Sequence, residues 1–431
     1  MTKKLKAARE ALEHIHETMG MNFGFELWDG SQVPSTPIDD KNNLRVRFAD
    51  PGVFTSLLRR PNVDTLIDLW MTKRVDLLGG TIFDFEEKRP KGKTRRLVKQ
   101  LSKAKLAKAA LPFLLSSSGG KKVHLKKDEG SRDGSEASNK KNIQYHYDVS
   151  NEFYALFLDE LMVYTCGYFT KWDNSLDQAQ RDKLDMICRK LRLKPGDRLL
   201  DIGCGWGALI CHAAEHYGVT AHGVTLSEKQ VDKGMKWIAE RGLKDKVTIE
   251  LKDFSKLTGR YNKISSIGMF EHVGIKNHRH YFMTVNRLLE PRGLYLHHAT
   301  TRPGKATNEQ FNKKPKEYQA IIKYLFPGGE LDHIGMSLQN LESSGFEVHD
   351  VEAWREHYVV TFEHWANRLM ANEKKAINIV GEETYRLWMI YLCGVGLAFR
   401  RGTINKFQTV ASKKTKGPSG LAPTRAELYA D

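Results

Sequence analysis

The sequence predicts an α/β fold, with a mostly parallel seven-stranded sheet covered by helices and a smaller mixed α/β domain before it. Two observations support this prediction. From residue 142 onward, short apolar strings rich in β-branched residues alternate with segments of helical period, and the chain, at 431 residues, is longer than a single core usually is. Strands are predicted at 198–202, 220–224, 247–251, 264–269, 294–298 and 346–351, and helices between them at 208–217, 227–241 and 280–289.

Composition divides the chain into four parts. Residues 1–115 are predicted to form an N-terminal accessory domain, in which the densely basic segment 88–108 carries apolar residues at near-helical spacing and indicates a basic amphipathic helix. Residues 116–141 contain almost no large apolar side chain and indicate a flexible linker. The main α/β domain follows at 142–413, and a tail occupies 414–431.

The charge and the cysteines bear on partners and compartment. With 68 Lys and Arg against 52 Asp and Glu, the chain has a formal net charge of +16, which favours binding to nucleic acid or to an anionic membrane surface and does not choose between them. Five cysteines without a CxxC pair favour a reducing compartment, the cytoplasm. No apolar run approaches the roughly 18 to 20 residues that span a bilayer.

A glycine-rich loop follows the first strand of the main domain. The segment LLDIGCGWGAL passes from a strand through Gly203, Gly205 and Gly207 into a helix, and glycine lets the backbone approach a ligand closely. Asp201 precedes the first glycine, and its acid suits a cationic amino-acid group better than a pyrophosphate. The loop therefore favours S-adenosylmethionine over NAD, while Cys204 within it is interpreted as a small packing residue.

The next strands are also followed by side chains suited to a nucleoside. Thr225 and Leu226 follow the second strand, and Asp253 with Phe254 follows the third, where an acid and an aromatic ring could hold the edge and face of adenine. This order of signals resembles class I methyltransferases, which have a Rossmann-like fold.

A narrower resemblance comes from several motifs in one order. The strings His146-Tyr147-Asp148, Phe157-Leu158-Asp159, Tyr164-Thr165-Cys166-Gly167-Tyr168-Phe169, DIGCGWG, GVTLS, MFEHVG, FPGGEL and GLAFRRG resemble those of the cyclopropane-fatty-acyl-phospholipid synthases and the related mycolic-acid methyltransferases. The similarity covers residues 142–413.

The resemblance extends the cofactor site. It implies that Thr225, Leu226 and Gln230 line the S-adenosylmethionine pocket and that Tyr164 and Thr165 cover its methionine end. The predicted cofactor-binding residues are then Tyr164, Thr165, Asp201, Gly203, Cys204, Gly205, Gly207, Thr225, Leu226, Gln230, Asp253 and Phe254. No metal site is predicted.

The resemblance also implies a reaction. In this family a methylene group is added to the cis double bond of unsaturated fatty acyl chains in phospholipids, through a carbocation that a bound bicarbonate deprotonates. Glu271, His298, Tyr358 and the main chain at Cys166 match the residues that hold bicarbonate. Because a carboxylate repels an anion, Glu271 and bicarbonate are expected to share a proton.

Aromatic side chains and one departure from the family pattern complete this prediction. Aromatic faces that could stabilise the carbocation are Tyr168, Phe169, Phe270 and Trp365. Thr300 stands where the family commonly places an isoleucine, which leaves a methyl-branched or methylene product as an alternative to the ring.

Other classes of protein are less well supported. A nucleic-acid methyltransferase would suit the charge, but the Asn-Pro-Pro-Tyr type of string is absent. A non-catalytic lipid-binding adaptor is disfavoured by the intact glycine loop and Glu271. The predicted partners are unsaturated phospholipid acyl chains and an anionic membrane surface, at the inner face of the cytoplasmic membrane. No nucleic acid is expected, and a homodimer is left open.

Overall fold

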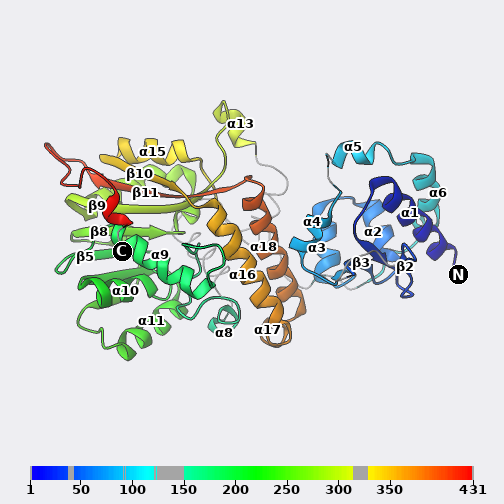
Figure 1. Cartoon of the computed structure of the whole chain (residues 1–431), viewed down its shortest axis with the longest axis horizontal. Helices are drawn as coiled ribbons and strands as arrows, with labels where there is room; N and C mark the ends of the chain where they lie inside the picture. The colour runs from blue at the N-terminus through cyan, green and yellow to red at the C-terminus, as the bar shows by residue number, and fades with distance from the viewer. Residues whose placement is uncertain are drawn as a thin grey trace. The chain divides into compact units, whose positions relative to one another are not determined.

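The computed structural model describes residues 2–36, 43–90, 92, 94–120, 123, 150–313 and 329–429 (Figure 1). Its contacts divide the chain into two units, Met1–Lys126 with Val380–Gly394, and Lys127–Ile379 with Val395–Asp431. Of the linker predicted at 116–141, only 116–120 and 123 are described, and the motif at 146–148 lies outside the described residues.

The N-terminal unit is a small mixed α/β structure, as predicted. Its four-stranded sheet has the order β2-β1-β3-β4, and its core joins the sheet to α1, α2 and α6 through buried side chains such as Leu12, Phe25, Val53 and Phe113. The bounds are α1 Lys3–Met19, β1 Gly24–Glu26, β2 Gln32–Val33, β3 Arg45–Phe48, α2 Gly52–Arg59, α3 Val63–Met71, β4 Val75–Leu78, α4 Ile82–Lys88, α5 Thr94–Val98 and α6 Lys103–Leu114.

The basic segment 88–108 is not one continuous helix, which corrects the prediction. Helix α4 ends at Lys88, α5 is a single short helix, and α6 begins at Lys103. Pro90 and Gly92, whose φ is +135°, disfavour helix after α4. Ser102 then caps α6, because its side chain accepts a hydrogen bond from the backbone N–H of Lys105.

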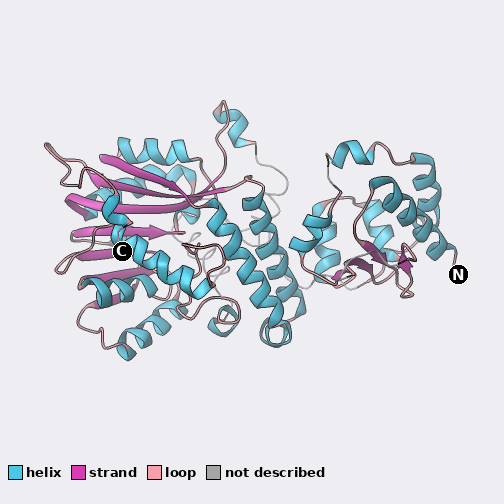
Figure 2. Cartoon of the chain, in the orientation of Figure 1, coloured by secondary structure: helices cyan, strands magenta, loops and turns pink. Residues whose placement is uncertain are grey.

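The second unit is built on a seven-stranded sheet of order β10-β11-β9-β8-β5-β6-β7 (Figure 2). The strands β9, β8, β5, β6 and β7 are parallel, whereas β11 runs antiparallel to both of its neighbours, β9 and β10. The bounds are β5 Arg198–Ile202, β6 Thr220–Thr225, β7 Val247–Leu251, β8 Tyr261–Ile267, β9 Leu289–Thr301, β10 Phe346–Ala353 and β11 Asn405–Lys413. The predicted fold class is confirmed.

Alternate side chains of the strands enter two cores, one on each face of the sheet. Leu199 and Leu294 pack in one core with α9 and α10, while Leu200 and Tyr295 pack in the other with α12. The helices of this unit are α8 Asn151–Tyr154, α9 Leu176–Lys190, α10 Ala208–Tyr217, α11 Glu228–Glu240, α12 His278–Leu288, α13 Asn308–Asn312, α15 Ile334–Ser343, α16 Arg355–Ala371 and α17 Glu373–Val380. The remaining helix, α18 Glu382–Arg400, belongs to the first unit up to Gly394 and to the second from Val395. Within the described ranges, no helix is both long and apolar enough to cross a membrane.

Strand β11 was not assigned from the sequence, and its register positions polar side chains. It lies between β9 and β10 and pairs with β9 so that Lys406 is opposite Thr300 and Gln408 is opposite His298. Directly opposed residues in an antiparallel pair bring their side chains into contact. This register therefore places two polar side chains beside the end of β9.

Candidate functional site

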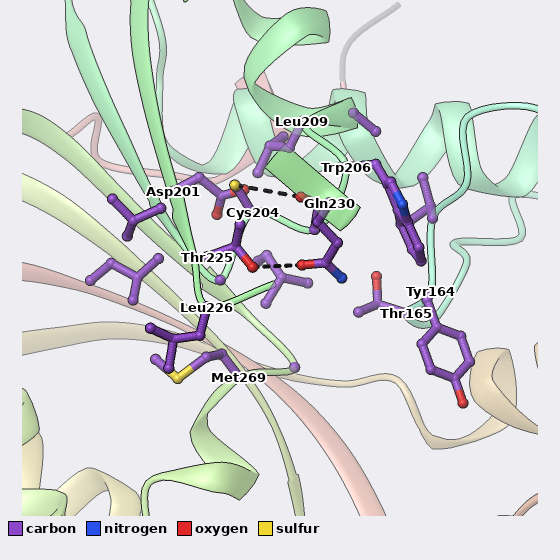
Figure 3. Close-up of a pocket in the computed structure, with 18 of the residues that line it drawn as sticks. Tyr164, Thr165, Asp201, Cys204, Trp206, Leu209, Thr225, Leu226, Gln230 and Met269 are labelled. Carbon is purple, nitrogen blue, oxygen red and sulfur yellow. Dashed lines mark hydrogen bonds between the residues drawn. The ribbon is translucent and has the colours of Figure 1, made fainter. Parts of the chain in front are cut away.

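A pocket lies at the carboxyl ends of β5, β6, β7 and β8, where open parallel sheets commonly bind ligands. It encloses about 1150 Å³ of empty space, including its open mouth. Figure 3 shows Tyr164, Thr165 and Trp206 on one side of this space and Thr225, Leu226 and Met269 on the other. Eleven of the twelve residues predicted for the cofactor line it: Tyr164, Thr165, Asp201, Gly203, Cys204, Gly205, Thr225, Leu226, Gln230, Asp253 and Phe254.

The twelfth residue, Gly207, acts through the backbone. It begins α10 in the left-handed region, with φ +92°, and is not a lining residue. Gly203 and Gly205 also have positive φ, of +80° and +56°, and a Cβ at Gly203 would lie 2.8 Å from Met269. The loop therefore needs glycine for its conformation and for its close approach to the next motif.

Cys204 packs in the interior, as interpreted from the sequence. Its backbone N–H and that of Gly203 donate to the carbonyl of Val224, at 3.1 and 2.9 Å. Burial raises the pKa of the thiol well above its usual value, so the side chain stays neutral. A Cβ added to Gly223 would lie 2.7 Å from its sulfur, which shows how closely the loop packs on β6.

Polar side chains in the pocket are held by their own hydrogen bonds. The Thr225 hydroxyl donates to Gln230 Oε1 at 2.6 Å (Figure 3), and Ser265 donates to Asp201 Oδ1 at 2.7 Å. Burial raises the pKa of Asp201 to about 6, although Ser265 and the Lys183 ammonium lower it. The pocket therefore presents a buried acid at the glycine loop.

Lys183 is a pocket residue that the sequence reasoning missed. It is buried on α9 and donates from Nζ to the Thr165 hydroxyl at 2.9 Å. Burial lowers its pKa to about 8, while Asp159 and other acids oppose this shift. Its place among buried positions of an amphipathic helix is the signal that could have identified it.

Beside the pocket lies a buried ion pair. Glu271 Oε1 accepts hydrogen bonds from the Thr300 backbone N–H at 2.8 Å and from Lys406 Nζ at 3.1 Å. Burial raises the pKa of Glu271, but Lys406 and Thr300 lower it, and the resulting pKa is about 2. A Cβ on the lining residue Gly268 would lie 4.0 Å from Lys406 Nζ, so the pair directly adjoins the pocket.

The other three predicted catalytic residues lie around the same pair. Lys406 Nζ lies 5.4 Å from the centre of the Tyr358 ring, which makes a cation–π contact. His298 packs edge-on against Trp354, with ring centres 5.2 Å apart, and Cys166 clusters with Trp354 and Tyr358. Glu271, His298, Tyr358 and Cys166 thus surround Lys406 and Trp354, although none of them lines the pocket.

Lys406 bears on the protonation of Glu271. The sequence predicted that Glu271 and bicarbonate share a proton, because a carboxylate repels an anion, and Lys406 is a nearby cation that this prediction did not include. With Lys406 at 3.1 Å and a pKa of about 2, the carboxylate is ionised at neutral pH. Burial raises the pKa of the Cys166 thiol to about 12, so this side chain is neutral, in agreement with a backbone role.

A series of aromatic contacts connects the pocket to the ion pair. Ring centres lie 5.3 Å apart for Trp206 and Tyr154, 5.3 Å for Tyr154 and Tyr164, 5.2 Å for Tyr164 and Trp365, and 6.0 Å for Trp365 and Tyr358. Of the aromatic residues predicted to stabilise a cation, Trp365 belongs to this series. Phe270 instead packs in the core, and Tyr168 stacks on Trp354.

Comparison with known proteins decides the family. The model of the mycolic acid cyclopropane synthetase family matches residues 135–409. The protein belongs to this family. The predicted class of enzyme, an S-adenosylmethionine-dependent methyltransferase, is confirmed with it.

Individual members of the family differ in how much of the chain they match. A probable fatty acid methyltransferase of Pseudomonas putida is 35% identical over 97% of this chain and 98% of its own. The cyclopropane-fatty-acyl-phospholipid synthase of Escherichia coli is 39% identical over 62% of this chain and 66% of its own. The crystal structure of a mycolic acid cyclopropane synthase complexed with SAH and CTAB has 35% identity and a TM-score of 0.60, covering 64% of this chain and 98% of that one.

We predict that Lys406→Met destabilises the protein by about 3–5 kcal/mol, because it leaves the buried Glu271 carboxylate without its cation. Since the pKa of Glu271 is lowered in the folded state, its contribution to stability is present above pH ~4.5 and is lost as the pH falls toward 2. Urea unfolding of both proteins from pH 7 to pH 3 measures this. The variant should lose less stability on acidification, and equal pH dependence would contradict the assignment.

Proposed function

We propose that the protein transfers a methylene group from S-adenosylmethionine to the cis double bond of unsaturated fatty acyl chains in phospholipids, giving cyclopropane fatty acids. The observation that carries the proposal is the buried Glu271–Lys406 pair directly beside the glycine-loop pocket. The names of two relatives support the substrate class: one is a cyclopropane mycolic acid synthase, and the other is a cyclopropane-fatty-acyl-phospholipid synthase.

The pocket fits S-adenosylmethionine, which would supply an electrophilic methyl group. The loop from Gly203 to Gly207 gives the close backbone approach that a Cβ would block, and Asp201 offers a buried acid for a cationic amino-acid group. Thr225 and Gln230 lie toward one side and Tyr164 and Thr165 toward the other (Figure 3). In this proposal these residues hold the cofactor and exclude water from the reacting carbon.

The ion pair is proposed to hold bicarbonate, which would supply the base that removes a proton from the added carbon. Glu271 Oε2 and His298 Nε2 are buried and have no hydrogen-bond partner among the described side chains and backbone. Glu271 can accept the hydroxyl proton of bicarbonate, and His298 can donate to one of its oxygens. Lys406 and Lys183 would offset the added negative charge, because both are close enough to Cys166 to lower the pKa of its thiol.

The aromatic series supports the chemistry on the lipid. Aromatic faces stabilise a cation by roughly 0.5 to 2 kcal/mol each when they are desolvated. Trp365 is fully buried and contacts both Tyr164 at the pocket and Tyr358 at the ion pair. We propose that these three rings border the acyl chain and stabilise the positive charge that develops on it.

A second candidate is the transfer of a methyl group without ring closure. One observation favours it: the relative that matches 97% of the chain is a probable fatty acid methyltransferase. The family resemblance adds that Thr300 stands in place of an isoleucine. The Thr300 hydroxyl contacts Lys406 Nζ at 3.2 Å. Both candidates use the same cofactor and alkene and pass through the same carbocation. In one, the added carbon loses a proton as it closes the ring; in the other, a hydride shift precedes the loss of the proton and leaves a methylene alkene.

We predict that Glu271→Gln lowers the rate of product formation at least ~100-fold, because the variant would no longer hold the general base, and general-base catalysis contributes about this much. The affinity for SAH should change little. Purified protein would be incubated with S-adenosylmethionine and unsaturated phospholipid vesicles, and a gain of CH2 would be read by mass spectrometry. Ozonolysis separates a ring from an alkene product. Glu240→Gln, at the exposed last residue of α11, serves as the matched control. Wild-type turnover by Glu271→Gln would contradict the proposed role.

The phospholipid substrate requires access to a bilayer, and we propose that the end of α6 provides it. Leu111, Leu114 and Leu115 are 64%, 51% and 100% exposed, which is unusual for neighbouring leucines on the surface of a monomeric soluble protein. The same helix carries the exposed side chains of Lys103, Lys105 and Lys108 and has no acidic residue. An apolar tip with adjacent cations fits an anionic lipid surface at the cytoplasmic side of the membrane.

We predict that changing Leu111, Leu114 and Leu115 together to Ser weakens binding to phosphatidylglycerol-containing vesicles by roughly 100-fold, at about 1 kcal/mol for each partly inserted leucine. Sedimentation with vesicles at increasing salt measures this, and the binding of wild-type protein should fall with salt. Leu66→Ser, at an exposed leucine of α3 in the same unit, is the control. Equal binding by both variants, or salt-insensitive binding, would contradict this surface.

A further inference from the structure

His298 is held by a chain of hydrogen bonds that begins at a buried lysine. Lys190 Nζ donates to Gln408 Oε1 at 2.7 Å, and Gln408 Nε2 lies 2.9 Å from His298 Nδ1. All three side chains are buried, and the β9–β11 register places Gln408 directly opposite His298. Nothing in the family prediction assigned a role to Lys190 or Gln408.

The charge of Lys190 fixes the orientation of the Gln408 amide. An ammonium group has only donors, so the amide atom that faces it is the carbonyl oxygen, and the NH2 group faces His298. An NH2 group can only donate, so Nδ1 of His298 is an acceptor and carries no proton. The single proton of the neutral ring is therefore on Nε2.

The surroundings keep the ring neutral and in place. Burial, followed by the ammonium groups of Lys406, Lys183 and Lys190, lowers the pKa of His298 well below its usual value, and the neighbouring His297 acts in the same direction. Glu352 accepts hydrogen bonds from both Lys190 and the Trp354 indole N–H, and Trp354 packs against the His298 ring. Lys190 and Trp354 thus share the carboxylate of Glu352.

We propose that Gln408 and Lys190 are positioning residues, which hold His298 as the neutral Nε2–H tautomer so that it presents a hydrogen-bond donor at the anion site. The inference deepens the proposed function, because the anion is the bicarbonate proposed there. Nε2 has no hydrogen-bond partner among the described residues and is buried, so its donor is available to a bound anion. A carboxylate partner on Nδ1 is the common arrangement for a histidine that must accept a proton; an amide partner instead keeps the proton on the far nitrogen.

The tautomer can be measured in the protein without substrate. Two-bond ¹H–¹⁵N spectra of protein labelled at histidine, with His298→Asn to assign the signals, should show His298 with a protonated Nε2 and an unprotonated Nδ1, unchanged from pH 5.5 to 8. A protonated Nδ1, or titration of His298 near pH 6.5, would overturn the proposal. This result does not depend on turnover, so an inactive protein with the Nε2–H tautomer would reject the proposed function and leave the tautomer standing.

The Gln408→Glu variant tests the consequence for activity. Its carboxylate can still pair with Lys190 but can only accept from Nδ1, so the spectra should show Nδ1 protonated. We expect kcat to fall about 10- to 100-fold, the range found when the partner of an oriented histidine is changed, with KM for S-adenosylmethionine unchanged. Ser412→Ala, which removes a hydrogen bond from the same strand to His349, is the control and should leave the tautomer and kcat as in the wild type. An unchanged tautomer and kcat in Gln408→Glu would overturn the proposal.

Discussion

The pairing of β11 with β9 is the constraint on which the site depends. One register places Lys406 opposite Thr300 and Gln408 opposite His298, so a single strand supplies both the cation of the Glu271 pair and the partner of the histidine. A shift of one residue would turn both side chains to the other face of the sheet. The strand lies between β9 and β10, and so it is held by hydrogen bonds on both edges.

The interior around β11 contains three buried lysines, each of which lies near a carboxylate. Lys183, Lys190 and Lys406 are buried, and each has a carboxylate nearby: Asp159, Glu352 and Glu271. A lone buried charge would cost several kcal/mol, and the nearby carboxylate offsets this cost for each lysine. The arrangement keeps His298 neutral and Glu271 ionised, which is the combination that an anion with one proton requires.

The sequence predicted the part of the structure that is encoded locally. The strand-loop-helix signal at Gly203–Gly207 gave β5 and α10 with their bounds, and eleven of the twelve predicted cofactor residues line one pocket. It did not reveal β11: residues Asn405–Lys413 were placed in the main domain, but no strand was assigned to them. Lys406 and Gln408 were missed because their partners, Glu271 and His298, lie more than a hundred residues away in the sequence. Lys183 was missed because the helical pattern of α9 was not used to assign buried positions. The basic segment was expected as one helix because its charge hid the break at Pro90 and Gly92.

In the proposed site, an ionised Glu271 and a neutral His298 hold an anion beside the glycine-loop pocket. Titration of the SAH-loaded protein with ¹³C-bicarbonate, followed by ¹³C NMR line broadening, measures this most directly. We expect saturable binding of one equivalent, which His298→Ala abolishes while SAH remains bound. Absence of saturable binding to the wild-type protein, or equal binding to the variant, would contradict it.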